Sequence, residues 1–321
     1  GVRQMTKKIA VNACSLLTPM TGIGRYTYNL FSEIIKRDDC DVGFLYGTSW
    51  DKSLVVPVPQ FQKTASVVKT LFPYARTIRR VIQGRLLRKK LTREKYDLSH
   101  EPNFFALSYA GPVISTIHDL SVIKFPDFHT SDRVKMFEKH LLTTIDKSEY
   151  LITDSEFVRQ DIIETFGVNP EKIKTTLLGV EHCFFPYSKE DVLPLMERYK
   201  LEYKSYFLVV STLEPRKNFK LVVDAYLRLD KNIKDRFPLV IVGMNGWEMS
   251  QFEGDLERLR RQGYLRMPGY VPDEDLPALY SAAKLFLYPS FYEGFGLPPL
   301  EAMACGKPVL SRECPGLRDY V

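Results

Sequence analysis

The stretch "YFLVVSTLEPRKNFKLVVDAYLRL", Tyr206–Leu229, decides the fold class. It opens with a short apolar run, passes through a polar turn that holds one proline and two cations, and continues with apolar residues at helical spacing. A strand that leads directly into an amphipathic helix is the repeating unit of sheets with parallel strands. This stretch therefore predicts an α/β domain.

The same alternation of short apolar runs and helical patterns continues along most of the 321 residues. Between Glu181 and Asp191 the periodicity lapses and Pro186 intervenes, which is typical of a domain boundary. We therefore predict an α/β protein of two Rossmann-like, doubly wound domains, residues 1–185 and 186–321, which face each other across a cleft. The other expected strands are Lys8–Ala13, Val42–Gly47, Pro112–Asp119, Glu149–Ser155, Ile173–Val180, Pro238–Gly243, Lys284–Ser290 and Lys307–Ser311.

The composition is that of a globular protein. Hydrophobic residues make up 45% of the chain and charged residues 26%, and no apolar run approaches the roughly 18 residues that a membrane span requires. The five cysteines are scattered without a C-x-x-C pair, which argues against a disulfide framework and against a zinc site. Gly1–Gln4, which precede Met5, are expected to be a vector-derived remnant. We expect a cytoplasmic protein with reduced thiols.

Much of the basic excess of this chain, whose net charge is +6, lies in Ala75–Lys95, where nine cations face one acid. Ile78, Ile82 and Leu86 recur there at helical spacing. Such a helix can lie on the inner face of a membrane, attracted to anionic lipid by about 1 kcal/mol per cation. It can equally be the solvated face of an ordinary helix, and both interpretations stay open. Nucleic acid is not an expected partner, because no recognition motif accompanies the charge.

Two glutamates lie eight positions apart in "YPSFYEGFGLPPLEAMACG", Tyr288–Gly306. The Pro-Pro pair suits the first turn of a helix, where a missing N–H costs nothing. The amides of Gly294–Leu297 would then form the positive end of that helix, where a phosphate can bind. Glu293 precedes this helix start and Glu301 follows it by about one turn, so the two carboxylates can reach the two ends of a nucleoside diphosphate sugar.

A phosphate site next to carboxylates needs positive charge, and the opening stretch supplies it. Arg216 and Lys217 stand in the turn after the strand "YFLVVST". Arginine suits forked contacts to phosphate oxygens and lysine acts as a point charge. Taken alone, two cations in a turn would more simply be solvated.

Four segments together make the chain resemble the retaining glycosyltransferases of family 4. They are "GIGRY" (Gly22–Tyr26), "TIHDL" (Thr116–Leu120), "LEPRKN" (Leu213–Asn218) and the run around "YEGFGLPPLEAMACGKPVL" (Tyr292–Leu310). The resemblance covers nearly the whole chain in order, and the two glutamates with seven residues between them are its most specific element. It implies the GT-B architecture of two Rossmann-like domains. It also implies that the C-terminal domain is truncated, because similar proteins continue beyond "GLRDYV".

The resemblance carries roles onto matching positions of this sequence. His118 and Glu293 are the implied catalytic residues: His118 would touch the sugar, in part through its backbone carbonyl, and Glu293 would contact the donor sugar. Glu301 would bind the ribose, and the two cations would neutralise the diphosphate leaving group. The residues expected to bind the donor are Gly22, Gly24, Arg216, Lys217, Val271, Glu293, Gly294, Phe295, Gly296, Leu297 and Glu301.

One position departs from this pattern, since many similar proteins carry Gly-Arg where this chain has Ser211-Thr212. Arg216 is expected to supply the missing charge. The resemblance implies neither a catalytic metal nor another cofactor, with amides and cations in place of Mg²⁺. The Asp-rich run Asp38–Asp41 resembles the D-x-D metal motif of other glycosyltransferases, but it follows a helix, so we interpret it as a helix end in a surface turn.

The sequence thus favours a retaining transfer of a hexose from a nucleotide sugar to a hydroxyl. "LEPRKN" resembles bacterial mannosyltransferases, which favours mannose from GDP-mannose and an acceptor that is a glycan or a lipid-linked saccharide. A UDP-hexose stays open as an alternative donor. Two alternative functions also stay open: a nucleotide-sugar 2-epimerase, and a binding protein of the same fold that has no turnover.

Overall fold

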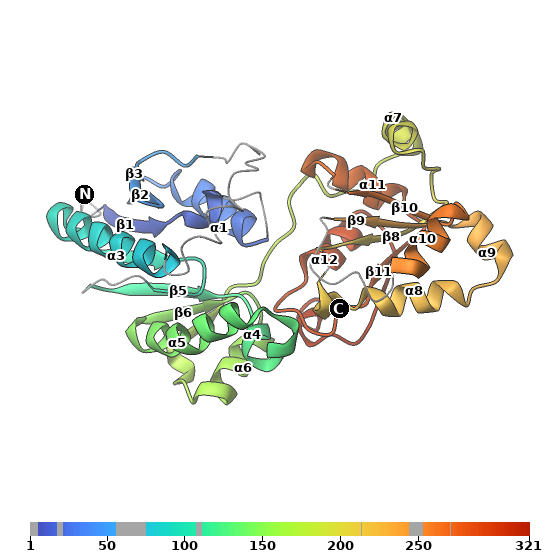
Figure 1. Ribbon diagram of the computed structural model, residues 1–321. Helices are drawn as coiled ribbons and strands as arrows, with labels where there is room; N and C mark the ends of the chain where they lie inside the picture. The colour runs from blue at the N-terminus through green and yellow to red at the C-terminus, as the bar shows by residue number, and fades with distance from the viewer. Residues whose placement is uncertain are drawn as a thin grey trace. The chain divides into compact units, whose positions relative to one another are not determined.

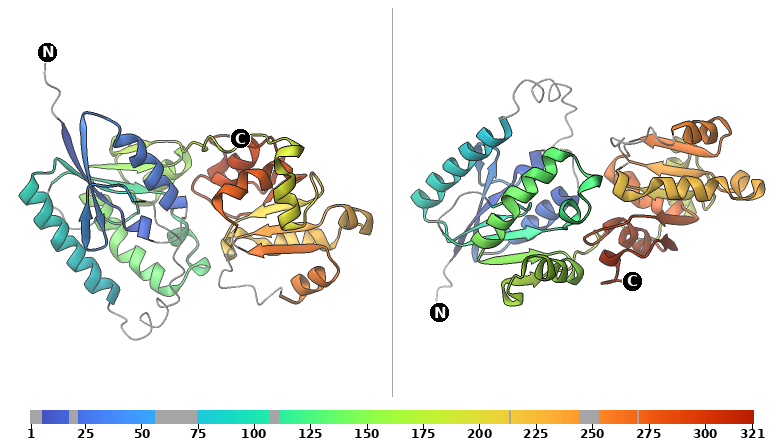
Figure 2. Two further views of the ribbon diagram at one scale, coloured as in Figure 1. Left: turned by 90° about the horizontal axis from the view of Figure 1, so that it is seen from above. Right: turned by 60° about the horizontal axis from the view of Figure 1, so that its bottom comes forward.

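A computed structural model of the chain describes residues 6–17, 22–55, 75–106, 111–212, 214–243, 253–269 and 271–321, with residues 75–81 as backbone only. The chain divides into two compact units (Figures 1 and 2). The first contains residues 1–124 and 131–177, and the second contains Phe125–Thr130 and Leu178–Val321. The expected boundary at residue 185 therefore lies at Leu177, and a short segment of the first half belongs to the second unit.

Unit 1 is built on a seven-stranded sheet in the order β3-β2-β1-β4-β5-β6-β7. All neighbouring strands are parallel except β3, which runs antiparallel to β2. The order reverses direction beside β1, as expected for a doubly wound sheet. The strands are β1 (Lys7–Asn12), β2 (Cys40–Tyr46), β3 (Ser49–Asp51), β4 (Leu98–Glu101), β5 (Val113–Ile117), β6 (Tyr150–Thr153) and β7 (Ile173–Thr175).

Helices cover both faces of this sheet. Alternate residues of β1 show the two faces: Val11 packs with Phe31 of α1, whereas Ala10 packs with Leu87 and Leu91 of α3. Phe137 of α5 belongs to a third apolar cluster, over β5 and β6. The helices are α1 (Gly22–Ile34), α3 (Ala75–Glu94), α4 (Ser121–Lys124), α5 (Ser131–Lys147) and α6 (Glu156–Phe166).

Unit 2 is built on a five-stranded parallel sheet in the order β10-β9-β8-β11-β12. Its first strand, β8, is central, so the order reverses between β8 and β11. Ligands of open α/β sheets bind outside the carboxyl ends of the strands at such a reversal. The strands are β8 (Phe207–Val210), β9 (Leu239–Val242), β10 (Leu265–Gly269), β11 (Leu285–Tyr288) and β12 (Val309–Ser311).

The sheet of unit 2 is also covered on both faces, as Figure 1 shows for α8 and α11. Leu208 and Val240 face a cluster that includes residues of α7, α11 and α12, whereas Val209 and Ile241 face α8 and α10. This alternation along parallel strands confirms the predicted α/β architecture. The helices are α7 (Lys189–Tyr199), α8 (Phe219–Leu227), α9 (Lys231–Arg236), α10 (Glu253–Arg261), α11 (Leu276–Ala282) and α12 (Leu297–Ala304).

The glycines of "GIGRY" lie in a helix rather than in a loop: α1 begins at Gly22, and Gly24 is buried in its first turn. One expected strand is shorter than predicted. The strand expected over residues 173–180 ends at Thr175. On the basic helix, Ile82 is 44% exposed and Leu86 is 40% exposed, which leaves both interpretations of this helix open. The side chain of Ile78 lies outside the described residues.

The expectation for the Asp-rich run is confirmed. Asp38–Asp41 follows α1 in a turn and enters β2, with Arg37 bound to Asp39 and Lys52 bound to Asp41. All five cysteines are free thiols. Within the described part of the chain, no helix combines the length and apolar character needed to cross a bilayer.

Candidate active site

In unit 2, the carboxyl ends of β8 and β11 bring the predicted phosphate cations next to the first glutamate. After β8 the chain turns through a short 3₁₀ helix, Pro215–Lys217, and Asn218 takes a left-handed conformation (φ 54°) before α8. The Phe291 amide donates to the Arg216 carbonyl (2.9 Å). The Asn218 side-chain amide donates to the Pro289 carbonyl (3.2 Å). These two hydrogen bonds hold the two loops together.

The side chains at this junction form a buried ion cluster. Lys217 Nζ lies 2.6 Å from Glu293 Oε1, and Arg216 Nη1 lies 2.9 Å from Glu293 Oε2. Arg216 Nε also contacts Glu214, at 3.1 Å. Arg216, Lys217 and Glu293 thus come together as the sequence predicted, and a cation stands here although Thr212 occupies the position of the usual arginine.

Burial and neighbouring charges shift the pKa values of Glu293 and Lys217. Burial alone would raise the pKa of the Glu293 carboxyl, but the charges of Lys217 and Arg216 outweigh it and lower the pKa to about 2. Burial, assisted by the Arg216 charge, lowers the pKa of the Lys217 ammonium, which Glu293 opposes. The carboxylate is therefore ionised at any physiological pH, and its charge favours the charged form of the ammonium.

The turn after Glu293 is more enclosed than the sequence suggested. Gly294, Phe295 and Gly296 are buried, and Leu297 begins α12. Gly296 has a φ of 86°, and a Cβ there would lie 2.5 Å from a methyl carbon of Leu317. A Cβ on Gly316 would lie 2.1 Å from the Glu293 carbonyl oxygen. The side of the turn that meets Gly316 and Leu317 is therefore closed to a ligand.

The remaining predicted donor residues of unit 2 lie in its interior. Glu301 is buried in α12 and accepts a hydrogen bond from the Tyr280 hydroxyl (3.0 Å). Val271 is 3% exposed and packs in the same apolar cluster as Tyr280. The side chain of Val271 is therefore a core side chain.

In unit 1, His118 directly follows the carboxyl end of β5. Its Nδ1 lies 2.5 Å from Asp154 Oδ2 and its Nε2 lies 2.8 Å from the Pro102 carbonyl. The rings of Tyr26 and Phe104 meet it edge to face. Burial would lower the pKa of His118, but Asp154 and the Pro102 carbonyl together outweigh it and raise the pKa. Both ring nitrogens thus face acceptors, which suits a charged imidazolium rather than a general base.

This pair makes stability depend on pH. A His118 pKa raised above its unfolded value contributes stability that is complete below about pH 6.5 and is lost as pH rises through the folded pKa. Asp154→Asn is expected to cost about 1.5–3 kcal/mol at pH 6 and less at pH 8. Melting temperatures of both proteins at the two pH values measure this. Asp161→Asn is the control, because its partner is a lysine, Lys124 (2.7 Å), and not a histidine. Equal losses at pH 6 and pH 8 for Asp154→Asn would contradict the assignment.

Comparisons with known proteins bear directly on this site. Residues 20–182 match the family model described as "Glycosyltransferase Family 4", and residues 195–321 match the model described as "Glycosyl transferases group 1". The O-antigen chain mannosyltransferase B of Escherichia coli is 36% identical over 310 residues, which are 94% of this chain and 81% of that protein.

The chain belongs to glycosyltransferase family 4. It is therefore a glycosyltransferase.

Solved structures show the same fold. Sucrose-phosphate synthase from Thermosynechococcus elongatus superimposes with a TM-score of 0.70 at 18% identity, over 97% of this chain and 82% of that chain. HepE of Anabaena, solved in complex with UDP and glucose, gives 0.66 at 19%, over 98% and 83%. The family-4 chain thus has the GT-B architecture of two Rossmann-like domains.

Sequence reasoning missed several residues of the glycosyltransferase site. Glu214 lies inside the quoted "LEPRKN" but was assigned no role, although it holds Arg216. Asp154 follows β6 and could have been paired with His118 only through the sheet order. Tyr288 ends β11, and its ring lies 5.8 Å from Lys217 Nζ. Among the described residues, no group of three or more His, Cys, Asp or Glu side chains is placed to hold a metal ion.

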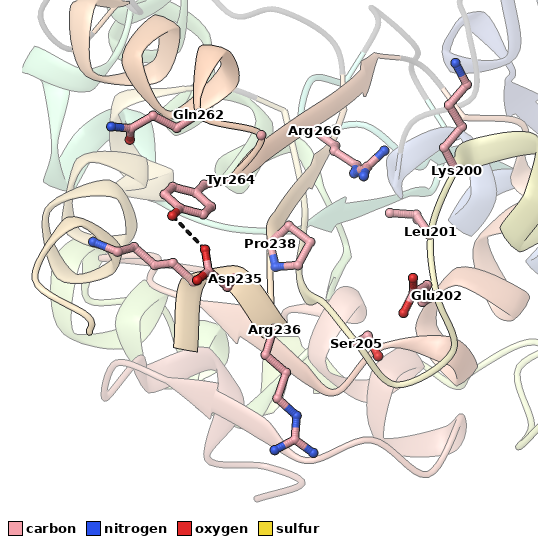
Figure 3. A pocket seen from close by; sticks show the side chains of 12 residues that line it. Lys200, Leu201, Glu202, Ser205, Asp235, Arg236, Pro238, Gln262, Tyr264 and Arg266 are labelled. Atoms are coloured by element: carbon pink, nitrogen blue, oxygen red, sulfur yellow. Dashed lines mark hydrogen bonds between the residues drawn. The ribbon is translucent and has the colours of Figure 1, made fainter. Parts of the chain in front are cut away.

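A hollow of about 330 Å³ lies at the amino ends of β8, β9 and β10 (Figure 3). Two of its polar side chains are engaged in hydrogen bonds: Tyr264 donates to Asp235 (2.8 Å) and Lys234 donates to the Leu227 carbonyl (3.2 Å). Because ligands of such sheets bind at the carboxyl ends, this hollow lies at the wrong edge for the donor.

Proposed function

We propose that this family-4 enzyme transfers mannose from GDP-mannose to a hydroxyl of a glycan or lipid-linked saccharide, with retention at the anomeric carbon. The observation that carries the proposal is the buried cluster of Arg216, Lys217 and Glu293 at the strand-order reversal of unit 2. The relationship to an O-antigen mannosyltransferase supports mannose as the sugar and an O-antigen type of glycan as the acceptor.

Donor binding follows from the charges at the junction of the two loops. The diphosphate would lie against Arg216 and Lys217 near the start of α12, where the helix dipole favours an anion. Glu293 would face the sugar and Glu301 the ribose. Val271 would contact the base through its backbone. Gly22 and Gly24, in the first turn of α1, would offer amides of unit 1 to the phosphates or the acceptor.

The chemistry we propose is a front-face displacement. The bond between the anomeric carbon and the phosphate oxygen breaks, the acceptor oxygen bonds to the same face of that carbon, and the acceptor proton passes to the departing phosphate. Charge accumulates on the phosphate as the sugar becomes oxocarbenium-like, so fixed cations beside it lower the barrier. Arg216 and Lys217 supply that positive charge, so we propose a reaction without a metal or other cofactor. The ring of His118 is engaged by Asp154 and the Pro102 carbonyl, so His118 would support the sugar from unit 1 through its backbone carbonyl.

A panel of nucleotide sugars tests this function. We expect GDP-mannose to raise the melting temperature most and to be consumed only when a mannose-containing acceptor is present, with unchanged turnover in EDTA. Stronger stabilisation and transfer with a UDP-hexose would overturn the donor assignment. Epimerised sugar formed without acceptor would instead identify a 2-epimerase, and binding without transfer to any acceptor would identify a binding protein.

We further propose that the enzyme acts in the cytoplasm with α3 against the anionic inner face of the membrane. Leu87 and Leu91 anchor α3 to the sheet, which leaves Ile82 and Leu86 exposed between cations. Arg85 and Lys89, one helical turn apart, flank Leu86 and are also exposed. Aliphatic groups among cations are the pattern of an interfacial helix.

Flotation with vesicles that contain anionic lipid measures this interaction. Replacement of Arg85 and Lys89 by Gln removes two charges and is expected to weaken partitioning by about 30-fold, at roughly 1 kcal/mol per cation. The matched control replaces Lys220 and Lys231, two exposed cations of unit 2, by Gln. Equal losses in both double variants, or no binding of the wild type at low salt, would remove the membrane proposal.

A further inference from the structure

The loop that carries Glu293 is braced by a segment from the first half of the chain. We call Phe125–Thr130 the aromatic strap. It leaves unit 1 after α4, belongs to unit 2 over its whole length, and returns at α5. The strap is continuous through α4 with His118, so one stretch of chain carries one candidate catalytic residue and meets the loop of the other.

The contacts of the strap are aromatic and fall on the two residues before Glu293. The Phe128 ring stacks on Phe291 with centroids 5.6 Å apart and planes 25° apart. The Phe125 ring meets Tyr292 at 5.4 Å. Phe125 and Phe128 also stack on each other, at 5.7 Å and 12°. Such pairs contribute about 0.5–1.5 kcal/mol each beyond the area that they bury.

The strap itself is a preformed turn. Pro126 stands in the first position of a 3₁₀ turn, Pro126–Phe128, where its fixed φ suits the geometry. The Phe128 amide donates to the Phe125 carbonyl (3.0 Å), and the His129 amide donates to the Pro126 carbonyl (2.9 Å). The two rings are therefore presented in a fixed arrangement.

The two residues that contact the strap, Phe291 and Tyr292, directly precede Glu293 of the ion cluster. Tyr292 is 4% exposed and its carbonyl accepts a hydrogen bond from Arg216 Nη1 (3.4 Å). The Arg312 guanidinium lies 4.6 Å from the Phe291 ring, on the residue that Phe128 stacks against. A shift of Phe291 or Tyr292 would therefore move the Glu293 backbone and alter its distances to Lys217 and Arg216.

We infer that Phe125 and Phe128 are positioning residues for sugar transfer, which hold Glu293 through Tyr292 and Phe291. This inference rests on the role of Glu293 given under Proposed function. Because a misplacement of about 1 Å at a reacting group can cost about 100-fold in rate, Phe125→Ala is expected to lower kcat by about 10- to 100-fold. KM for the nucleotide sugar is expected to change by less than about 3-fold, since the phosphate cations stay in place.

The test is a double-mutant cycle in the full chain with GDP-mannose and acceptor. Phe125→Tyr, which keeps the ring, should restore kcat to within about 3-fold of the wild type. In a Glu293→Gln background, Phe125→Ala should cause less than about a 2-fold further loss, because both changes remove the same interaction. The matched control is Phe237→Ala, which breaks a stacked pair with Phe207 (5.2 Å, 16°) at the amino end of β9 and should leave kcat unchanged.

The outcomes distinguish a failure of the strap inference from a failure of the proposed site. Wild-type kcat in Phe125→Ala contradicts the strap inference and leaves the proposed site unaffected. The same holds if Phe125→Ala lowers kcat as much in the Glu293→Gln background as in the wild type. A kcat that falls in Phe125→Tyr as far as in Phe125→Ala also overturns the strap inference. If Phe125→Ala does not fold, Phe128→Leu replaces it in the same cycle. Wild-type activity of Glu293→Gln instead refutes the proposed site, whatever the strap variants do.

Discussion

Glu293→Gln is expected to lower kcat at least about 10²- to 10³-fold, the range typical for loss of one group that stabilises developing charge. The substitution keeps the size of the side chain but removes its charge. In this enzyme we propose that the carboxylate contacts the sugar, and its charge favours the charged form of Lys217, 2.6 Å away. Because burial and Arg216 already lower the pKa of Lys217, the variant is expected to lose positive charge at the phosphate as well.

Steady-state kinetics and the pH profile measure this effect. The pKa of Glu293 is about 2, so its titration should not produce the acid limb of the wild-type profile. The control is Asp275→Asn, which disrupts another buried carboxylate of unit 2 that binds Arg198 (3.1 Å) and Tyr199 (2.7 Å). Equal losses of kcat in both variants would indicate general destabilisation and would contradict the role of Glu293.

Lys217→Met should lower kcat by about 10²- to 10³-fold, because a fixed cation no longer meets the charge that develops on the leaving phosphate. Lys220→Met is the control, since Lys220 is exposed and pairs with Asp224 across one turn of α8. Wild-type turnover in Lys217→Met would refute the phosphate clamp.

Melting temperatures of the single and double variants test the ion pair of Lys217 with Glu293 separately from its role in catalysis. Removing one partner of a buried ion pair costs about 3–5 kcal/mol, whereas replacing both partners together is often nearly neutral. We therefore expect Lys217→Met/Glu293→Gln to melt above either single variant while remaining inactive. A double variant that melts below both single variants would contradict the geometry of the pair.

The parts of the fold that could be predicted are those with local signals. Apolar runs followed by helical patterns identified β8, α8 and β11, and a glycine-proline signal identified the start of α12. These signals work because strands and helices impose periods of 2 and 3.6 residues on which side chains are buried. The cluster at Glu293 followed once parallel strands were expected, since their carboxyl ends meet at one edge.

The parts that could not be predicted depend on contacts between distant segments. Nothing in "FPDFHT" indicates that it packs in the second unit, because a proline-containing turn has no period to interpret. Gly316 and Leu317 pack against the turn at Gly296, which is also a contact between separate segments of the chain. The sequence predicted the helix α3. Because cations lie on all its sides, the pattern did not indicate which apolar residues face the core.

The domain boundary was misplaced for a related reason. α7 begins at a capping box of Ser188 and Asp191 and contains Pro194. The sequence suggested a linker because periodicity lapses between Glu181 and Asp191 around Pro186, although the second unit has already begun at Leu178. The three-dimensional boundary at Leu177 has no comparable signal in the chain.

A crystal structure of the protein with GDP-mannose or GDP bound tests the proposed phosphate site. We expect diphosphate oxygens within about 3 Å of Lys217 Nζ and the Arg216 guanidinium, beside the start of α12. A diphosphate bound elsewhere, such as in the hollow lined by Arg236 and Arg266, with the Lys217–Glu293 pair untouched, would contradict it.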